Sequence, residues 1–499
     1  MNLLYDERLD GPLAKTDRQT LLAELRAAVP DLEILHAEED LRPFECDGLS
    51  AYRALPLLVV LPERIEQAAA VLRLCHARRV PVVARGAGTG LSGGALPLEQ
   101  GVLLVMARFN RILELDPAGR CARVQPGVRN LAISQAAAPD GLYYAPDPSS
   151  QIACSIGGNV AENAGGVHCL KYGLTVHNLL KLEVLTIEGE RITLGADALD
   201  APGFDLMALF TGSEGMLGIV TEVTVKLLPT PRVARVLMAS FDSVDKAGRA
   251  VGDIIAAGII PGGLEMMDKL AIRAAEDFIH AGYPVEAEAI LLCELDGVES
   301  DVQEDIARVR AVLERAGATE VSLARDEAER ARFWAGRKNA FPAVGRMSPD
   351  YYCMDGTIPR RHLPRVLKGT AELSEKYGLQ VANVFHAGDG NMHPLILFDA
   401  NQPGELERAE ALGGEILELC VAVGGTITGE HGVGREKINQ MCTQFTPDEI
   451  ACFHAVKAAF DAEGLLNPGK NIPTLNRCAD YGALRVHGGK LPFSELERF

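Results

Sequence analysis

A glycine-rich loop at residues 85–95 constrains the fold of the N-terminal half more than any other feature of the sequence. It reads Arg-Gly-Ala-Gly-Thr-Gly-Leu-Ser-Gly-Gly-Ala, and its glycines have the G-x-G-x-x-G spacing of dinucleotide-binding folds. That fingerprint requires a helix directly after the glycines, inside a βαβ unit. Here Gly94–Gln100, which contains Pro97, separates the loop from the next predicted strand, and a crossover needs about a dozen residues. We therefore predict that the loop joins two short strands, either as a plain turn or as a nest of backbone N–H groups for a pyrophosphate.

Two further glycine-rich segments follow within the same half of the chain. Residues 155–166 read Ser-Ile-Gly-Gly-Asn-Val-Ala-Glu-Asn-Ala-Gly-Gly, after an Asp-Pro-Ser-Ser turn at residues 147–150. Residues 212–221 read Gly-Ser-Glu-Gly-Met-Leu-Gly-Ile-Val-Thr and lead into an alternating strand. Three such loops are hard to explain as turns alone. They predict a large, flat, phosphorylated cofactor bound by backbone donors.

Size and charge limit the kinds of partner. A chain of 499 residues is expected to form about two or three domains. Its formal net charge of −19 argues against nucleic acid, which needs concentrated Lys and Arg, but leaves small anionic substrates possible. The eleven cysteines contain no Cys-x-x-Cys pair, so neither a disulfide framework nor an iron–sulfur site is expected. The N-terminus does not resemble a signal peptide, and no apolar run reaches the ~18 residues of a membrane span.

The pattern of apolar residues predicts an α+β chain in which the arrangement of strands and helices changes at one point. Residues 15–36 are predicted to be a short helical prelude, and short strands recur from residue 57, with a helix at 64–79. An alternating, half-buried strand at 219–227 ends at Leu-Pro-Thr-Pro, residues 228–231, the clearest boundary signal. Beyond it, strand-like runs alternate with amphipathic helices, which predicts an antiparallel sheet. We expect an N-terminal helical segment (1–52), a cofactor domain (53–231), a substrate or cap domain (232–446) and a C-terminal segment that returns to the cofactor domain (447–499).

Two short motifs in the second half carry the candidate chemistry. Residues 385–393 read Phe-His-Ala-Gly-Asp-Gly-Asn-Met-His, and residues 429–432 read Gly-Glu-His-Gly. Two histidines and a glutamate can form a three-ligand metal site with an open position, which leaves His431 as a base. The same cluster could also act without metal, through imidazoles that polarise a hydroxyl group.

Taken together, these motifs resemble those of the vanillyl-alcohol-oxidase/p-cresol-methylhydroxylase (PCMH) superfamily. The histidine motifs are similar to those of its D-2-hydroxyacid dehydrogenase branch. Within that branch, the tail residues Asn476–Ala479 and Glu495–Phe499 look like those of bacterial glycolate oxidase D subunits. The resemblance implies a PCMH-type FAD-binding domain of two subdomains, an α+β cap domain with an antiparallel sheet, and a C-terminal helical segment.

The resemblance also implies which residues contact FAD. The phosphate loop contributes Arg85, Gly86, Gly88, Thr89, Gly90, Ser92, Gly93 and Gly94. The later loops contribute Asp147, Ser149, Gly157, Gly158, Asn159, Asn163, Gly212, Ser213, Gly215, Gly218 and Ile219, and the C-terminal segment contributes Asn467. Thr89 stands where some relatives carry a histidine bonded to the flavin, so non-covalent FAD is implied.

For the reaction, the resemblance implies that His386, His393 and Glu430 bind a divalent metal, zinc before manganese or iron. It further implies that His431 is the catalytic base, that Asn391 lies beside the substrate and that Arg337 binds the substrate carboxylate. D-2-hydroxyglutarate relatives have a lysine near residues 352–355, where this chain has Cys353 and Met354. A second carboxylate would lose a partner there, which favours a small monocarboxylate.

The function implied is oxidation of glycolate, and of D-lactate as well, with hydride transfer to the flavin. A second FAD-type subunit (E) and an iron–sulfur subunit (F) would receive the electrons, with the chain cytoplasmic or peripheral on the inner membrane. Three alternatives remain: a free-standing D-lactate or D-2-hydroxyglutarate dehydrogenase, a zinc hydrolase without flavin, and an inactive FAD-binding scaffold. The hydrolase would leave the three glycine loops unexplained.

Overall fold

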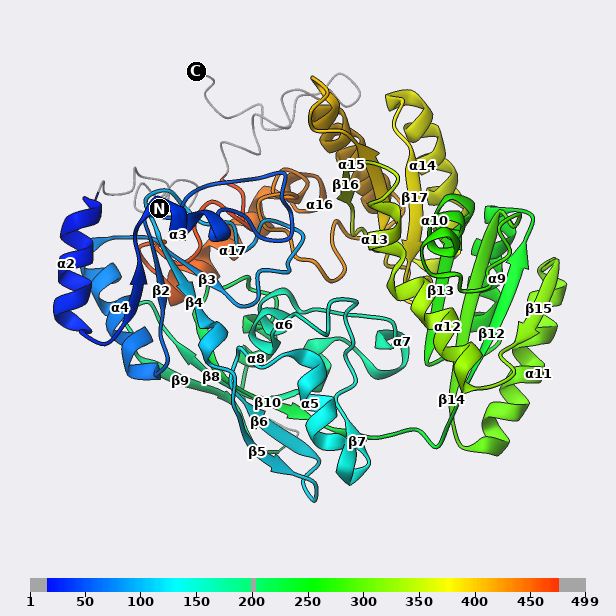
Figure 1. Cartoon of the computed structure of the whole chain (residues 1–499), viewed down its shortest axis with the longest axis horizontal. Helices are drawn as coiled ribbons and strands as arrows, with labels where there is room; N and C mark the ends of the chain where they lie inside the picture. The colour runs from blue at the N-terminus through cyan, green and yellow to red at the C-terminus, as the bar shows by residue number, and fades with distance from the viewer. Residues whose placement is uncertain (1–15, 199–202, 475–499) are drawn as a thin grey trace.

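The computed structural model describes residues 16–198 and 203–474 and consists of two lobes (Figure 1). The N-terminal sheets and the last helix, α17 (Pro447–Phe460), form one lobe, and the second half of the chain forms the other around a separate sheet. The predicted α+β class is confirmed. The tail motifs at 476–479 and 495–499 lie outside the described residues.

The first sheet has the strand order β1-β2-β4-β3. Its strands are β1 (Glu33–Leu35), β2 (Leu58–Leu61), β3 (Val82–Arg85) and β4 (Val102–Val105). Helices α2 (Arg18–Ala28) and α4 (Ile65–Arg78) cover it with one apolar core, in which the predicted inward residues of α4, Ala68, Val71, Leu72 and Cys75, are fully buried. The N-terminal segment is therefore not purely helical, because β1 pairs antiparallel with β2.

The glycine loop connects β3 to β4, and these strands are parallel neighbours. The absence of a Rossmann helix is confirmed, since residues 86–101 contain no helix. Our argument from crossover length nevertheless did not anticipate a parallel pair. The irregular connection, glycine loop included, is long enough to serve as the crossover itself.

A second sheet, with order β5-β6-β10-β8-β9, completes the first lobe. Its strands are β5 (Ile112–Asp116), β6 (Cys121–Val124), β8 (Leu179–Leu185), β9 (Arg191–Gly195) and β10 (Ile219–Lys226), all antiparallel. The prediction that β10 is half-buried is wrong: Val220 and Thr224 on its other face are buried too. The short helices α5 (Asn130–Ala137), α6 (Ile156–Glu162), α7 (Cys169–Tyr172) and α8 (Leu206–Phe210) and the two-stranded pair β7 (Leu142–Tyr143) and β11 (Leu228–Pro229) complete this part.

The second lobe is built on an antiparallel sheet with order β15-β12-β14-β13-β17-β18-β16, as predicted. Its strands are β12 (Val233–Phe241), β13 (Gly263–Asp268), β14 (Ala289–Gly297), β15 (Glu320–Leu323), β16 (Asp350–Cys353), β17 (Val381–Phe385) and β18 (Pro394–Phe398). Alternate residues of β12 enter two different cores, Leu237 and Ala239 on one face and Val236 and Met238 on the other. Helices on both faces therefore explain the continuous apolar runs of these strands.

Helices α9 (Val244–Ala256), α11 (Glu299–Arg315) and α14 (Leu363–Tyr377) bury their apolar stripes in one core. The second core contains residues of α10 (Lys269–Ile279), α12 (Glu327–Lys338) and α13 (Ala340–Val344). Helix α15 (Glu405–Ala422) lies beside α14 and packs against β16 and β18. The remaining helical pieces are α3 (Glu38–Leu41) and α16 (Met441–Gln444).

Of the described cysteines, Cys442 is disulfide-bonded and nine are free thiols. Among the helices of residues 16–198 and 203–474, none combines the length and apolar character that a bilayer span requires.

After α17 the chain returns to the first lobe. Leu466 bridges to Val82 of β3, and Leu465 and Leu466 lie in the core of the first sheet. Lys457 Nζ donates to the carbonyl of Met216, and Asn467 Nδ2 donates to the carbonyls of Gly94 and Glu214. This return fixes the far end of the glycine loop.

Candidate active site

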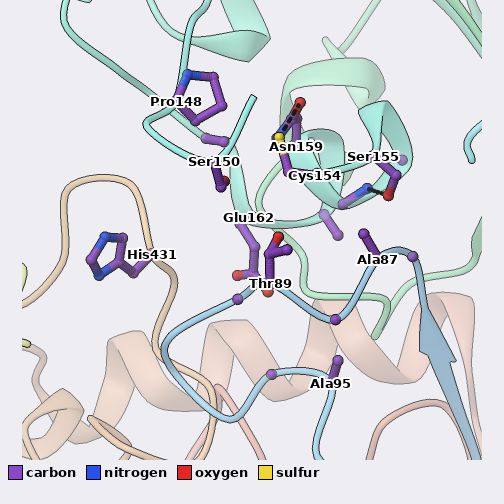
Figure 2. Close-up of a pocket in the computed structure, with 18 of the residues that line it drawn as sticks. Ala87, Thr89, Ala95, Pro148, Ser150, Cys154, Ser155, Asn159, Glu162 and His431 are labelled. Atoms are coloured by element: carbon purple, nitrogen blue, oxygen red, sulfur yellow. Dashed lines mark hydrogen bonds between the residues drawn. The ribbon is translucent and has the colours of Figure 1, made fainter. Parts of the chain in front are cut away.

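The glycine loops and the histidine motifs line one cavity of about 540 Å³. Its walls come from the β3–β4 connection, the turn at 148–150, α6 and the loop before β10. From the second half of the chain, His393, Glu430 and His431 line the same cavity. Figure 2 shows His431 at one end of it and Ser155 at the other. Its volume falls in the range expected for cofactor sites.

Two positions of the first loop require glycine, for different reasons. A Cβ at Gly86 would collide with Ser155 Oγ, and Gly88 has a φ of +71°, in the left-handed region that favours glycine. The loop therefore passes directly against α6, whose N-cap Ser155 accepts from the N–H of Gly158 at 3.4 Å. This close approach places the backbone of the glycine loop and the glycines of α6 on the wall of one cavity, where the loop can form the nest predicted for a pyrophosphate group.

Most of the predicted FAD-contacting residues line the cavity. These are Arg85, Gly86, Gly88, Thr89, Gly90, Gly94, Ser149, Gly157, Gly158, Asn159, Ser213, Gly215, Gly218 and Ile219. Ser92, Gly93, Asp147, Asn163, Gly212 and Asn467 do not line it.

Asp147 and Asn467 have structural partners instead. Asp147 accepts from the ring of His168 at 2.9 Å, and His168 also lies 3.1 Å from Glu294 of the other lobe. Burial opposes protonation of that ring, but the carboxylates Asp147 and Glu294 prevail and raise the pKa of His168 to about 10. Asn467 supports the loop from behind, through its bonds to Gly94 and Glu214.

The predicted metal ligands converge on one carboxylate oxygen. His386 Nε2 and His393 Nε2 each lie 3.2 Å from Glu430 Oε1. His386, in the turn after β17, and His393, directly before β18, are buried at the edge of the second-lobe sheet. Burial opposes ionisation of Glu430, yet His386 and His393 hold its pKa well below the usual range.

This geometry fits a cation. Neither ring nitrogen of His393 has a hydrogen-bond partner among the described residues, although Nε2 points at a carboxylate only 3.2 Å away. The ligand atoms of the three residues lie within 4.8 Å of one another. His386 Nε2 is within hydrogen-bond distance of Glu430 Oε1. The two nitrogens and the oxygen together match the N/O donor set that zinc and manganese accept.

A second set, Asp355, His393 and His431, is also close enough to hold a metal. Asp355, however, already accepts from the backbone N–H groups of Gly429, Glu430 and His431, and from the hydroxyl of Thr428. Its carboxylate is therefore committed to fixing the loop that carries Glu430 and His431. The first set is the better candidate.

His431 has the environment of a neutral base. Its ring stacks on His393 with centroids 4.9 Å apart, and Nδ1 has no hydrogen-bond partner within the described ranges. Burial lowers the pKa of His431 to about 4, so that the unprotonated imidazole faces the cavity.

Arg337, on α12, is buried, and its three guanidinium nitrogens differ in their hydrogen bonding. Its Nε donates to Glu265 Oε2 at 2.7 Å, while Nη1 and Nη2 find no partner in the part of the chain that the structure describes. Buried N–H groups rarely stay unpaired, so a ligand carboxylate is the expected partner. Arg337 itself does not line the cavity, but the next two residues, Lys338 and Asn339, do.

Asn391 does not point freely at a substrate. Its Nδ2 donates to Asp355 Oδ1 at 2.7 Å and to Thr357 Oγ1 at 3.1 Å, and the residue is absent from the cavity lining. Asn391 instead helps to hold Asp355.

Sequence reasoning missed four buried carboxylates around the site: Glu162, Glu214, Glu265 and Asp355. Glu162 and Glu214 lie inside the glycine-rich motifs, so their position among glycines was a usable signal. Glu265 and Asp355 stand outside any motif, and no local pattern identifies them.

The sequence of the chain is similar to those of known proteins along its length. Residues 56–195 match an FAD binding domain, and residues 230–471 match the C-terminal domain of FAD linked oxidases. The chain is 78% identical to glycolate oxidase subunit GlcD of Escherichia coli K12, over the full length of both. It is 32% identical to a D-lactate dehydrogenase of Anaerostipes hadrus, covering 88% of this chain and 94% of that protein.

Among solved structures, p-cresol methylhydroxylase superposes with a TM-score of 0.76 at 17% identity, covering 92% of this chain and 97% of that one. At that identity the likeness concerns the fold. With both domain matches in chain order and a relative aligned from end to end, the chain belongs to the FAD-linked oxidases, a family of oxidoreductases.

Proposed function

We propose that this protein oxidises a small 2-hydroxy acid, glycolate and also D-lactate, to the 2-oxo acid as the catalytic subunit of a glycolate oxidase. One observation carries the proposal: His393, Glu430 and His431 line the same cavity as the three glycine loops. The full-length similarity to the Escherichia coli subunit supports glycolate, and the Anaerostipes enzyme supports D-lactate.

Different side chains of the protein bind the substrate, remove its proton and hold the catalytic loop. The two free Nη atoms of Arg337 bind the substrate carboxylate as a fork, which orients C2. His431 removes the hydroxyl proton, because its neutral ring faces the cavity. Asn391 and Asp355 keep the loop that carries His431 in place.

Two bound groups complete the proposed site. FAD, held non-covalently by the glycine loops, supplies the hydride acceptor. A divalent metal, zinc first, held by His386, His393 and Glu430, would lower the pKa of the substrate hydroxyl.

Substrate size is less constrained than the sequence suggested. Cys353 and Met354, which stand where D-2-hydroxyglutarate relatives have a lysine, are buried and do not line the cavity. Neither residue therefore contacts a substrate there. Lys338, however, lines the cavity beside Arg337 and could contact a second carboxylate. D-2-hydroxyglutarate is therefore the informative comparison substrate.

We propose that the reduced flavin passes its electrons to another protein; the described residues contain no iron–sulfur ligand pattern. We propose the second FAD-type subunit (E) and the iron–sulfur subunit (F) as acceptors, with the chain held peripherally on the inner membrane through them. We also retain the domain boundaries at 52/53, 231/232 and 446/447 as proposals. The boundary at 231/232 separates the sheets of the first lobe from the seven-stranded sheet, whereas β1 and β2 pair across the boundary at 52/53.

Anaerobic mixing of the purified chain with glycolate, D-lactate or D-2-hydroxyglutarate tests the function directly. We expect the flavin absorbance near 450 nm to bleach with glycolate and D-lactate, and much less with D-2-hydroxyglutarate. Protein that stays colourless after addition of FAD would contradict the proposal, and a protein with metal but no flavin would favour the hydrolase. An inactive scaffold would bind FAD but bleach with none of the three.

A further inference from the structure

We propose that Glu265 is a positioning residue that aligns the metal ligand His386 and the carboxylate-binding Arg337 at the same time. The inference rests on the proposed function and concerns a residue to which no motif assigned a role.

Glu265 connects the two groups with its two oxygens. Oε1 lies 2.8 Å from His386 Nδ1, and Oε2 accepts from Arg337 Nε at 2.7 Å. The Glu265 side chain is fully buried, and the side chains of His386 and Arg337 are 4% and 1% exposed. No water competes for these contacts, so both bonds are strong and fixed in direction.

The sheet sets this arrangement. Strand β13 pairs antiparallel with β17, with Met266 opposite Phe385 and Met267 opposite Val384. Continuing that register places Glu265 opposite His386, where the β17 ladder ends. Directly opposite residues on adjacent strands have side chains on one face, close enough to touch.

For His386, the contact selects one tautomer. A carboxylate only accepts, so Nδ1 carries the hydrogen that Glu265 binds. Nε2 lies 3.2 Å from Glu430 Oε1, so this nitrogen is the one that would meet a cation held by the two residues. Carboxylate-to-histidine contacts of this kind orient metal ligands and increase their basicity.

For Arg337, the contact fixes the plane of the guanidinium. Nε is occupied by Glu265, and both Nη atoms are buried without a partner among the described residues. The Nη pair therefore forms a preorganised fork for a carboxylate. One glutamate thus fixes the positions of His386, which would help to hold the metal, and of Arg337, which would bind the substrate carboxylate, relative to each other.

The test substitutes Glu265→Gln, which preserves shape. The amide offers one acceptor and one donor, so it cannot accept from both neighbours. We expect Zn²⁺ affinity of the EDTA-treated protein, measured by calorimetry, to fall by about 10- to 100-fold. We also expect acetate, a carboxylate without a hydroxyl, to bind about tenfold more weakly, measured by perturbation of the flavin spectrum.

Single-site variants separate the two effects. His386→Ala should weaken Zn²⁺ alone, and Arg337→Lys should weaken acetate alone, whereas Glu265→Gln weakens both. Glu294→Gln is the matched control. Glu294 is equally buried on the adjacent strand β14 and also bridges a histidine and an arginine, His168 and Arg330, but away from the cavity. It should keep both affinities.

If Glu265→Gln does not fold with flavin bound, Glu265→Asp replaces it, with smaller losses of both affinities expected. Unchanged Zn²⁺ and acetate binding in the folded variant would overturn the inference, as would equal losses in Glu294→Gln. Failure of the proposed function is distinguishable, because the wild-type protein would then bind no metal and show no bleaching.

Discussion

At the residue scale, the site is a set of side chains whose properties depend on burial. His431 illustrates this: the same imidazole in water would be half protonated near neutral pH, whereas burial keeps it neutral in this cavity. The stack on His393 and the loop bonds to Asp355 hold the ring at the cavity wall.

Replacing His431 with alanine should remove the proton acceptor without removing the cofactor. We expect flavin content to be unchanged and the rate of bleaching by glycolate in stopped-flow to fall by about 10²- to 10⁴-fold, the usual contribution of a general base. His454→Ala is the control, because His454 bonds to the carbonyl of Pro473 at 3.0 Å and lies outside the cavity lining. A rate that stays within twofold of wild type would remove His431 from the mechanism.

At the element scale, the two lobes are joined beside the site by a polar contact. The segment before α7 inserts His168 between Asp147 of its own lobe and Glu294 on β14, and Arg330 of α12 also binds Glu294 at 2.7 Å. Lys171 and Tyr172 of α7 both reach Asp296 on the same strand. This contact joins the two lobes through residues that do not line the cavity.

The His168 contact should make stability depend on pH in the alkaline range. Its folded-state pKa of about 10 exceeds the ordinary value of 6.5, so the folded state holds a proton that the unfolded chain releases. The stabilisation is complete below about pH 6.5 and is lost as the pH rises through about 10. We expect His168→Gln to lower the unfolding free energy by about 1–3 kcal/mol at neutral pH.

Thermal unfolding of wild type and His168→Gln from pH 6 to pH 10.5 measures this effect. The difference between their melting temperatures should shrink above pH 9. A difference that stays constant across the range would show that His168 acts by packing, through its contact with Trp334, and not by charge.

At the scale of the whole molecule, FAD should bind the first lobe non-covalently and stabilise it. Thr89 occupies the loop position where a histidine could bond covalently, and it lines the cavity. We therefore expect acid precipitation to release all flavin into the supernatant. The apoprotein should regain about 2.7 kcal/mol of stability when FAD is present at 100 times its Kd.

Absorbance of the supernatant and pellet after precipitation, and melting curves with and without FAD, measure both effects. Flavin that remains with the pellet after washing in denaturant would mean a covalent bond, for which His168 or His177 would then be the candidates to examine.

Local sequence determined much of this protein. Glycines that exclude side chains, apolar periods of two and of 3.6 residues, and two histidine motifs are properties of neighbouring residues, so they predicted the loops, most strands and the ligand types. The parallel pairing of β3 with β4, the burial of both faces of β10 and the partners of Asp147 and Asn391 depended on distant segments. Tertiary structure alone decided that Glu265 meets His386, 121 positions away. Glu265 meets His386 and Arg337 only when strand pairing brings the three residues together, and no local pattern encodes that pairing.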